Sequence, residues 1–344
     1  MSYESWSVKK KGKFLHYAGL TIENFNAVFN LLGYEFNHSR LKYHYDDNTP
    51  LKDYTRPKLS LKSCLLLVLI RLRRGLPLED LADCFGISAT HASTVFYTWI
   101  RYMYLTFKKL AKPMAVSAKH QRKGKPPCFR PFPKLRMILD STEFRIERPS
   151  NLRHQGNTHS SYKGCNTVKF AVGSSTQGGT SWISGGYEGR ISDKGLITKE
   201  KFVEILDEED MVMVDRGFPI DEILAAKKAK VLRPPSFKKG KTNLTAKEEA
   251  ATKAIAMVRI YVEHLIGRIK FFRLLNQRFE IHLLPYLTDL VYIGGFLCNF
   301  DRPYIGRITV PKTMTTKDKN VGDKKRYGKK TTNKKAKDYL LMSI

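Results

Sequence analysis

The strongest constraint on the fold is a change of pattern near Leu135, where helical periodicity gives way to short β-rich runs. Three runs follow in succession, LRMILDSTEFRI, TVKFAVGSS and TSWISGGYEG. Three consecutive strands predict an antiparallel meander. The chain then alternates, with helical patterns over residues 197–206 and 220–229 separated by the strand MVMVD and followed by the short strand KVLRP. Alternation of this kind predicts parallel additions to the same sheet, so we expect an α/β fold with a mixed sheet.

The residues before this region predict helices. LTIENFNAVFNLLGYEF (20–36) fits one amphipathic helix ended by Gly33, and KLSLKSCLLLVLIRLRRG (58–75) fits another. In the second segment Ser60 is a suitable N-cap and Gly75 a suitable stop. The first part of the chain is therefore predicted to be all-α.

The segment that follows has the pattern of a helix-turn-helix. A short helix over 78–85 ends at Gly86, and Ser88 can cap a second helix that begins near Ala89. In this arrangement the early residues of the second helix face the bases of the DNA major groove. An ordinary αα-hairpin packed on the next domain would give the same pattern, and the pattern alone favours neither. The basic charge of the chain favours the helix-turn-helix. The predicted DNA-facing residues are Thr90, His91, Ser93 and Thr94.

These patterns divide the chain into five regions. Residues 111–134 contain prolines and lysines without periodicity, which is typical of a linker. The last residues are strongly basic and poor in apolar side chains, which predicts disorder. The predicted regions are an N-terminal helical and basic region (1–57), a helix-turn-helix domain (58–110), a linker (111–134), the α/β domain (135–302) and a basic tail (303–344).

The charge balance indicates a polyanionic partner. Lysine and arginine number 61 against 32 acidic residues, giving a formal net charge of +29 and favouring nucleic acid over a merely adhesive basic protein. The five cysteines include no CxxC pair, which argues against a zinc finger or a disulfide scaffold. The N-terminus lacks a signal-peptide pattern, and the run CLLLVLI is too short to cross a bilayer. We therefore expect a soluble intracellular protein without a membrane partner.

Two of the predicted strands end in an aspartate. MILD gives Asp140 and MVMVD gives Asp215. A carboxylate beside an apolar strand is costly to bury without a cation, and two on neighbouring strands would lie close enough to repel. A hard divalent cation that also binds phosphate oxygens would relieve this repulsion. The simpler interpretation of Asp215 is a turn residue before Gly217, and a second strand ending in the same way weakens it.

A third carboxylate is available on the long helical segment MVRIYVEHLIGRIKFF. Glu263 lies there among basic residues, beside an apolar stripe with helical spacing. Glu263 could form an i,i+4 ion pair with Arg259, worth about 0.3–0.5 kcal/mol. Alternatively it could complete a metal site while the neighbouring cations hold a phosphate backbone.

The order of these motifs resembles a known family. ILDSTEFRIERP, SYKGCNTVK, GRISDKGL, VDRGF and VRIYVEHLIGRIK resemble the DDE superfamily endonuclease of PIF/Harbinger-type transposases, the eukaryotic relatives of bacterial insertion-sequence transposases. The resemblance covers residues 58–302 and implies an RNase H-like mixed sheet with flanking helices behind the helix-turn-helix. The chain lacks the Cys/His zinc-binding module of THAP-linked relatives, which leaves recognition of transposon ends to the helix-turn-helix and the basic flanks.

The resemblance also implies a catalytic site. The metal-binding triad falls on Asp140, Asp215 and Glu263, and Asp193 matches an accessory aspartate of the family. The implied cofactor is Mg²⁺ or Mn²⁺, as two ions that support phosphoryl transfer. On the exposed face of the Glu263 helix, the residues predicted to contact DNA are Arg259, Arg268 and Lys270. Weaker candidates outside this helix are Arg148, Arg153, Lys163 and Lys169.

The predicted function is therefore that of a DNA transposase that binds transposon ends and performs metal-dependent strand cleavage and strand transfer. Its partners would be double-stranded DNA, further copies of the chain, and a separate Myb-like helper protein of the kind some family members need. A eukaryotic host would place it in the nucleus, and any other host in the cytoplasm. The alternatives are a transposase-derived DNA-binding protein or nuclease, and a non-catalytic helix-turn-helix regulator.

Overall fold

The computed structural model describes residues 1–9, 11–33, 41, 59–110, 114–121, 124–235 and 245–301. The predicted basic tail (303–344) lies outside these residues, as do parts of the predicted N-terminal region and linker. The helices that precede the sheet are α1 (Tyr3–Lys9), α2 (Lys11–Ala18), α3 (Ile22–Leu31), α4 (Leu61–Arg74), α5 (Leu78–Phe85), α6 (Ala89–Lys109), α8 (Ala118–Gln121) and the 3₁₀ helix η3 (Pro127–Phe129).

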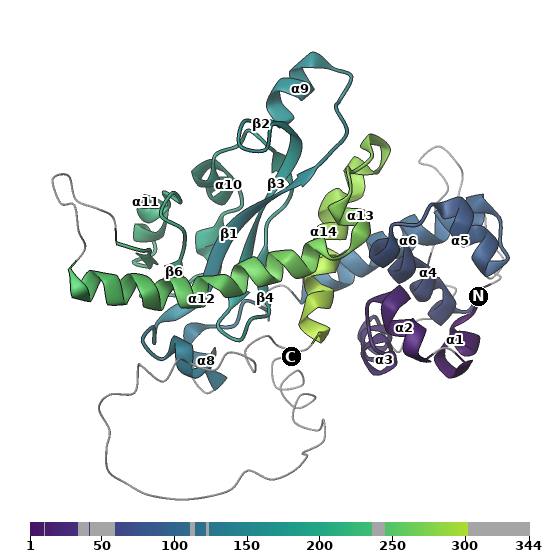
Figure 1. Cartoon of the computed structure of the whole chain (residues 1–344), viewed down its shortest axis with the longest axis horizontal. Helices are drawn as coiled ribbons and strands as arrows, with labels where there is room; N and C mark the ends of the chain where they lie inside the picture. The colour runs from purple at the N-terminus through teal and green to yellow at the C-terminus, as the bar shows by residue number, and fades with distance from the viewer. Residues whose placement is uncertain are drawn as a thin grey trace, which may run out of the picture.

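The remaining elements form a sheet with helices on both faces (Figure 1). The strands are β1 (Leu135–Arg145), β2 (His159–Ser160), β3 (Cys165–Ser175), β4 (Thr180–Ile183), β5 (Tyr187–Glu188), β6 (Met211–Met213) and β7 (Lys230–Leu232). The helices are α9 (Leu152–Thr158), α10 (Asp193–Lys199), η4 (Phe202–Ile205), α11 (Asp221–Ala225), α12 (Ala246–Lys270), α13 (Arg273–Asn276), η5 (Ile281–Tyr286), α14 (Leu287–Leu297) and η6 (Cys298–Phe300).

The sheet is mixed, as predicted. Strand β1 pairs antiparallel with β3, and β4 and β5 pair antiparallel with β3. On its other side β1 pairs parallel with β6, which pairs parallel with β7, giving the order β2-β3-β1-β6-β7. The predicted fold class, a mixed α/β sheet with flanking helices behind an all-α region, is confirmed.

Strand alternation sends side chains into different cores on the two faces of the sheet. Ile138 of β1 and Met213 of β6 pack with Val258 and Val262 of α12, which crosses the front of the sheet in Figure 1. The neighbouring side chain of Leu139 points the other way and packs in the core that α10 and α11 cover. The face of any β1 residue is therefore fixed by its place in this alternation.

The predicted caps of the helical region are present. The side chain of Ser60 accepts the amide of Ser63 at the start of α4, and the side chain of Ser88 accepts the amide of His91 at the start of α6. Helix α4 ends at Gly75 and α5 at Gly86, both in the left-handed region, with φ of 66° and 67°. A left-handed cap suits glycine because it carries no Cβ. Helices α5 and α6 thus form the expected helix-turn-helix.

The predicted linker contains packed structure. Gln121 of α8 is buried, donates to the carbonyl of Arg136 at 2.8 Å and accepts from the amide of Thr176 at 3.0 Å. Phe129 of η3 is buried against Tyr261 of α12. The described residues of the predicted linker therefore pack on the domain that follows, with Gln121 bound to the backbone of Arg136 and Thr176.

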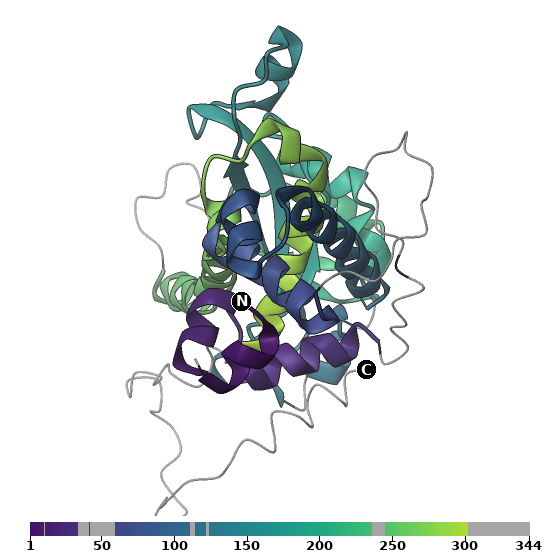
Figure 2. The same ribbon diagram turned by 90° about the vertical axis from the view of Figure 1, so that its right-hand side faces the viewer.

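Helix α6 joins the helix-turn-helix to the sheet domain. The rings of Phe107 on α6 and Phe296 on α14 stack with centroids 3.9 Å apart, and Tyr97 meets Tyr286 with centroids 4.6 Å apart. One core cluster runs through α4, α6, α12 and α14. In Figure 2, which is turned by 90° from Figure 1, the helical region lies in front of the sheet domain. The start of α6, which is predicted to face DNA, is thus held in a fixed relation to the sheet.

The stretch Ile281–Phe300 is long and apolar enough to cross a membrane by length and composition. In this structure 67% of its most apolar window is buried inside the protein. It includes α14, which packs between α6 and α12. Its apolar composition is accounted for by this central place in the core.

Candidate active site

Asp140 lies in the middle of β1, opposite Val172 of β3. The prediction that the strand ends at this aspartate was wrong, since β1 continues to Arg145. The residues after Asp140 keep the alternation of a strand, with Thr142 and Phe144 buried. Asp140 is half-buried, and its Oδ1 accepts a hydrogen bond from the amide of Ser141 at 2.8 Å.

Asp215 lies beside Asp140 at the adjacent strand. Ile138 of β1 is paired with Met213 of β6 in the parallel register, and each aspartate is two residues further along its chain. A shift of two residues returns to the same face, so both carboxylates belong to the face that α12 covers. The side chain of Asp215 is 53% exposed because β6 has ended, and its Oδ1 accepts the amide of Arg216 at 2.6 Å.

Helix α12 contributes a cation and the third carboxylate. Nη1 of Arg259 lies 3.0 Å from Oδ1 of Asp215, and the Arg259 side chain is largely buried. Glu263 follows four residues later, so it lies about one turn further along the same face of the helix. It is exposed. The predicted alternative, an ion pair between Glu263 and Arg259, is not formed, because Arg259 pairs with Asp215 instead.

The charges of these residues act on Asp140. Burial raises the pKa of its carboxyl from the usual 3.8 to about 6, against the opposing effects of the Ser141 amide and the Arg259 guanidinium. The carboxylates of Asp215 and Glu263 are smaller contributors to this rise. The three acidic side chains named by sequence are therefore close enough to influence one another electrostatically.

The donor set fits a hard divalent cation in kind. All three side chains offer carboxylate oxygens, which Mg²⁺ and Mn²⁺ prefer, and their mutual repulsion is what a cation would relieve. Within the described residues, however, no three His, Cys, Asp or Glu side chains are already drawn together around one point. Arg259 holds Asp215 in this structure, so a cation would have to compete with that guanidinium.

Asp193 lies away from these carboxylates. It begins α10 and pairs with Lys169 of β3 at 2.8 Å. Lys169 is opposite Glu143 of β1, three residues past Asp140, so these side chains belong to the opposite face of the sheet. Asp193 therefore pairs with Lys169 and lies on the other face of the sheet from Asp140. It likewise leaves Lys169 engaged within the protein.

The three cations predicted to contact DNA from α12 are placed differently. The side chain of Arg268 is only 12% exposed and lies 3.8 Å from Asp301, so it is turned into the protein. Lys270 is half-buried, with its ammonium 5.4 Å from the centre of the Phe144 ring. Arg259, Glu263 and Lys270 share one helical face at positions i, i+4 and i+11. Arg259 and Lys270 thus flank the acidic residue on the sheet side.

The predicted recognition residues of α6 do not share one environment. Thr90 is exposed, and His91 and Ser93 are half-buried. Thr94 is 6% exposed, and its hydroxyl donates to the carbonyl of Thr90 at 2.9 Å. Thr94 therefore cannot face DNA without a change in the helix, and the exposed start of α6 is formed by its neighbours.

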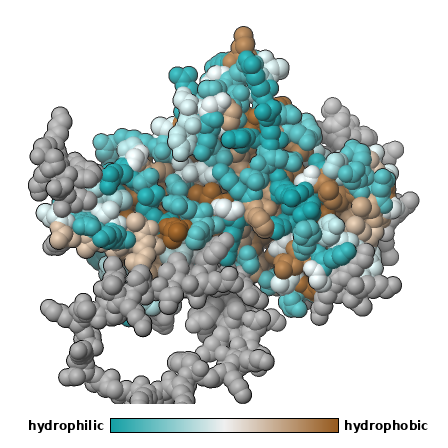
Figure 3. All heavy atoms as spheres, in the orientation of Figure 1, coloured by the Kyte–Doolittle hydropathy of each residue, from teal (hydrophilic) through white to brown (hydrophobic). Residues whose placement is uncertain are grey.

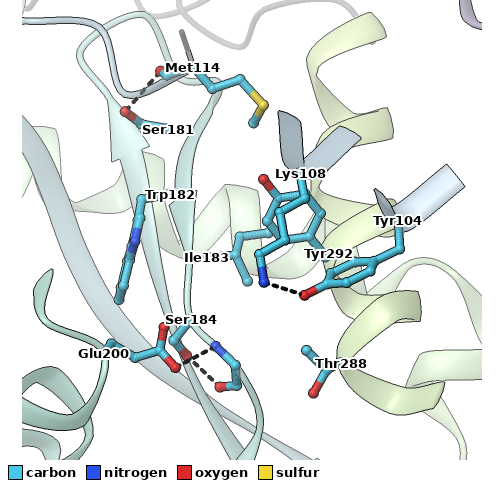
Figure 4. A pocket seen from close by; sticks show the side chains of 11 residues that line it. Tyr104, Lys108, Met114, Ser181, Trp182, Ile183, Ser184, Glu200, Thr288 and Tyr292 are labelled. Atoms are coloured by element: carbon cyan, nitrogen blue, oxygen red, sulfur yellow. Dashed lines mark hydrogen bonds between the residues drawn. The ribbon is translucent and has the colours of Figure 1, made fainter. Parts of the chain in front are cut away.

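A cavity of about 220 Å³ lies elsewhere, between α6, β4 and α14. Figure 4 shows Trp182, Lys108, Tyr104 and Tyr292 around it, with Nζ of Lys108 donating to the hydroxyl of Tyr104. Glu200 on its rim accepts the amide of Gly185 at 2.9 Å. No local sequence pattern predicts this cavity, because its lining comes from segments far apart in the chain.

Comparison with protein families finds a match for each of the two regions of the chain. Residues 139–299 match the DDE superfamily endonuclease, and residues 57–109 match the helix-turn-helix of the DDE superfamily endonuclease. No curated protein and no solved structure gave a significant match to the chain. The chain therefore contains a DDE superfamily endonuclease domain preceded by its helix-turn-helix domain, in agreement with the resemblance at the level of the superfamily.

Proposed function

We propose that the chain is a DNA transposase of the PIF/Harbinger-like group that cleaves and joins DNA strands through Asp140, Asp215 and Glu263. The observation that carries the proposal is the placement of Asp140 on the central strand, where both other carboxylates act on it. The match to a DDE endonuclease domain supports the reaction class. The match to a helix-turn-helix supports DNA as the substrate.

The three carboxylates would hold Mg²⁺ or Mn²⁺. Bound ions would activate the attacking group, either a water or a DNA 3′-hydroxyl, and would stabilise the leaving oxygen in an in-line displacement. The chain's own residues position the substrate: the start of α6 contacts the bases, and Lys270 attracts the phosphate backbone. Arg259 neutralises Asp215 until a cation binds there. No side chain of the protein needs to act as a nucleophile.

A non-catalytic helix-turn-helix regulator is the second candidate. The Arg259–Asp215 ion pair and the absence of a gathered metal-binding cluster in the described residues favour it. The two candidates differ in strand transfer. The experiment supplies a DNA with the terminal sequences that flank the gene, its 3′ ends already cut, together with a supercoiled target plasmid and Mg²⁺. Joining of the ends to the plasmid supports the transposase, and firm binding of the ends without any joining supports the regulator.

A further inference from the structure

The segment between β1 and β3 forms an arm, residues 147–164, that rises above the sheet domain in Figures 1 and 2. Its base is bound to the domain, since the amide of Glu147 donates to the carbonyl of Phe279 at 2.9 Å. Its upper part is α9 and the β2–β3 hairpin, tied together by Asn166, which donates to the Thr158 hydroxyl at 2.8 Å. The arm is therefore a built structure held away from the core.

The arm exposes two large apolar side chains. Leu152 is 79% exposed and Tyr162 is 85% exposed, the largest exposures of any described large hydrophobic side chain. Figure 3 shows an apolar tip on an otherwise hydrophilic arm. Tyr162 lies in the hairpin turn that Gly164 closes with a φ of 63°. The ring of Tyr162 is therefore accessible to a partner on a projecting turn.

The charge of the arm indicates which partner it fits. Arg148, Arg153 and Lys163 are basic, and the one acid, Glu147, accepts the amide of Ile281 at the base of the arm. Nζ of Lys163 lies 4.4 Å from the centre of the Tyr162 ring, which places a cation and an aromatic face together. A basic residue beside an exposed aromatic ring suits a nucleic-acid strand, where the cation meets phosphate and the ring meets a base or sugar.

The arm is continuous with the candidate active site. The ammonium of Lys270 lies over Phe144, four residues past Asp140 on the same face of β1. Burial lowers the pKa of Lys270, Lys163 lowers it further, and Asp140 is among the groups that raise it, so Lys270 is within electrostatic reach of both. Positive charge is therefore present both near the carboxylates, at Lys270, and on the arm, at Lys163.

The sheet gives the distance between the two. Asp140 is opposite Val172 and the hairpin begins at Cys165, seven positions further along β3. At 3.3 Å per residue this separation is at most about 23 Å. Along a DNA duplex, with 3.4 Å between successive base pairs, the same length spans about seven base pairs.

From this placement we infer that the arm binds the DNA flank, beginning within about seven base pairs of the cleaved bond, with Lys163 at a phosphate and Tyr162 against a base or sugar. The inference rests on the proposed function for the position of the cleaved bond. The prediction that the arm binds DNA does not depend on the proposed function. A second copy of the chain is the rival partner for the exposed ring of Tyr162.

The test measures binding of a fluorescein-labelled 30-base-pair duplex by fluorescence anisotropy in EDTA, where metal-dependent cleavage cannot occur. Tyr162→Ala should weaken binding about 5- to 30-fold, and Tyr162→Phe should restore it, because stacking needs the ring. Lys163→Ala should weaken binding and reduce the slope of log K against log salt by about one. Lys119→Ala is the matched control, since Lys119 is an exposed lysine on α8, which binds the opposite end of β1.

Unchanged affinity in both Tyr162→Ala and Lys163→Ala would overturn the inference. So would a Tyr162→Ala variant that binds DNA normally but sediments with a lower mass than the wild type, since the ring would then contact a second copy. A wild type that binds through the arm but never nicks DNA with Mg²⁺ would contradict the proposed function alone. Where nicking occurs, a photo-crosslinking residue at position 162, three residues beyond Cys165, should mark DNA no further than about ten base pairs from the nick.

Discussion

Arg259 of α12 reaches across to Asp215 at the end of β6, with 3.0 Å between Nη1 and Oδ1. The pair ties the helix that carries Glu263 to the strand that adjoins Asp140. It also places a guanidinium where a divalent cation would bind. Arg259 therefore ties together the elements that carry the proposed site, and it would compete with a cation for Asp215.

Removing this guanidinium should strengthen metal binding. With the Arg259→Gln variant and no DNA, we expect Mn²⁺ to bind about two- to fivefold more tightly, the range expected for losing a partly exposed ion pair. Isothermal titration calorimetry with Mn²⁺ measures the change. Lys253→Ala is the control, because Lys253 pairs with Glu249 in the same helix and away from the carboxylates. Weaker Mn²⁺ binding by Arg259→Gln would contradict the competition.

Asp140→Asn should stabilise the metal-free protein at high pH. The pKa of Asp140 is raised to about 6, so its ionised form is disfavoured in the folded state. The resulting loss of stability begins as pH rises above the unfolded pKa near 3.8 and is complete above about 6. We expect the variant to gain about 1 to 3 kcal/mol at pH 8 and almost nothing at pH 4, measured by urea denaturation in EDTA.

A matched substitution tests the sign of this effect. Asp215 is exposed and paired with Arg259, so Asp215→Asn should lose up to about 1 kcal/mol at pH 8 where Asp140→Asn gains. Equal destabilisation by both substitutions would show that Asp140 carries no electrostatic penalty.

Substitutions at Thr90 and Thr94 should have different effects, one on DNA binding and the other on stability. Thr90 is exposed at the start of α6, whereas Thr94 is buried and bonded to the Thr90 carbonyl. Thr94→Ala should lower the free energy of unfolding by about 1 kcal/mol and leave DNA affinity unchanged. Thr90→Ala should leave the melting temperature unchanged and weaken specific binding by about 1–3 kcal/mol. The reverse pattern would mean that α6 does not dock by its exposed start.

The helix-turn-helix and the endonuclease domain should unfold together. Phe107 and Phe296 stack across their junction and are buried. Phe107→Ala should cost about 3–5 kcal/mol and keep a single calorimetric transition. Leu105→Ala, on the same helix but 47% exposed, should cost much less. Two separate transitions in the wild type would contradict a shared core.

Local features of this fold were accessible from sequence. Ser60 and Ser88 were recognised as N-caps, and Gly75 and Gly86 as helix ends, because these roles depend on neighbouring residues only. The mixed sheet followed from the order of strand and helix patterns. Asp140 was expected at the end of a strand because an acid usually ends an apolar run, yet the alternation after it continues the strand.

Relations that depend on register were not accessible. Arg259 and Asp215 are 44 residues apart, and nothing in either segment predicts their pairing. The separation of Asp193 from Asp140 follows from which face of β3 Lys169 occupies. The exposure of Tyr162 depends on how α9 and the hairpin project from the domain. Each of these is set by how distant segments pack.

The most direct test of the central claim is cleavage of DNA that carries the terminal sequences flanking the gene, in Mg²⁺ or Mn²⁺. Wild type is compared with Asp140→Asn, Asp215→Asn and Glu263→Gln, and with Asp193→Asn, whose carboxylate lies on the opposite face of the sheet. We predict that the three triad variants lose nicking, retain DNA binding and lie at least about 100-fold below Asp193→Asn in rate. Nicking that survives in Asp140→Asn would show that the reaction is carried out elsewhere in the chain.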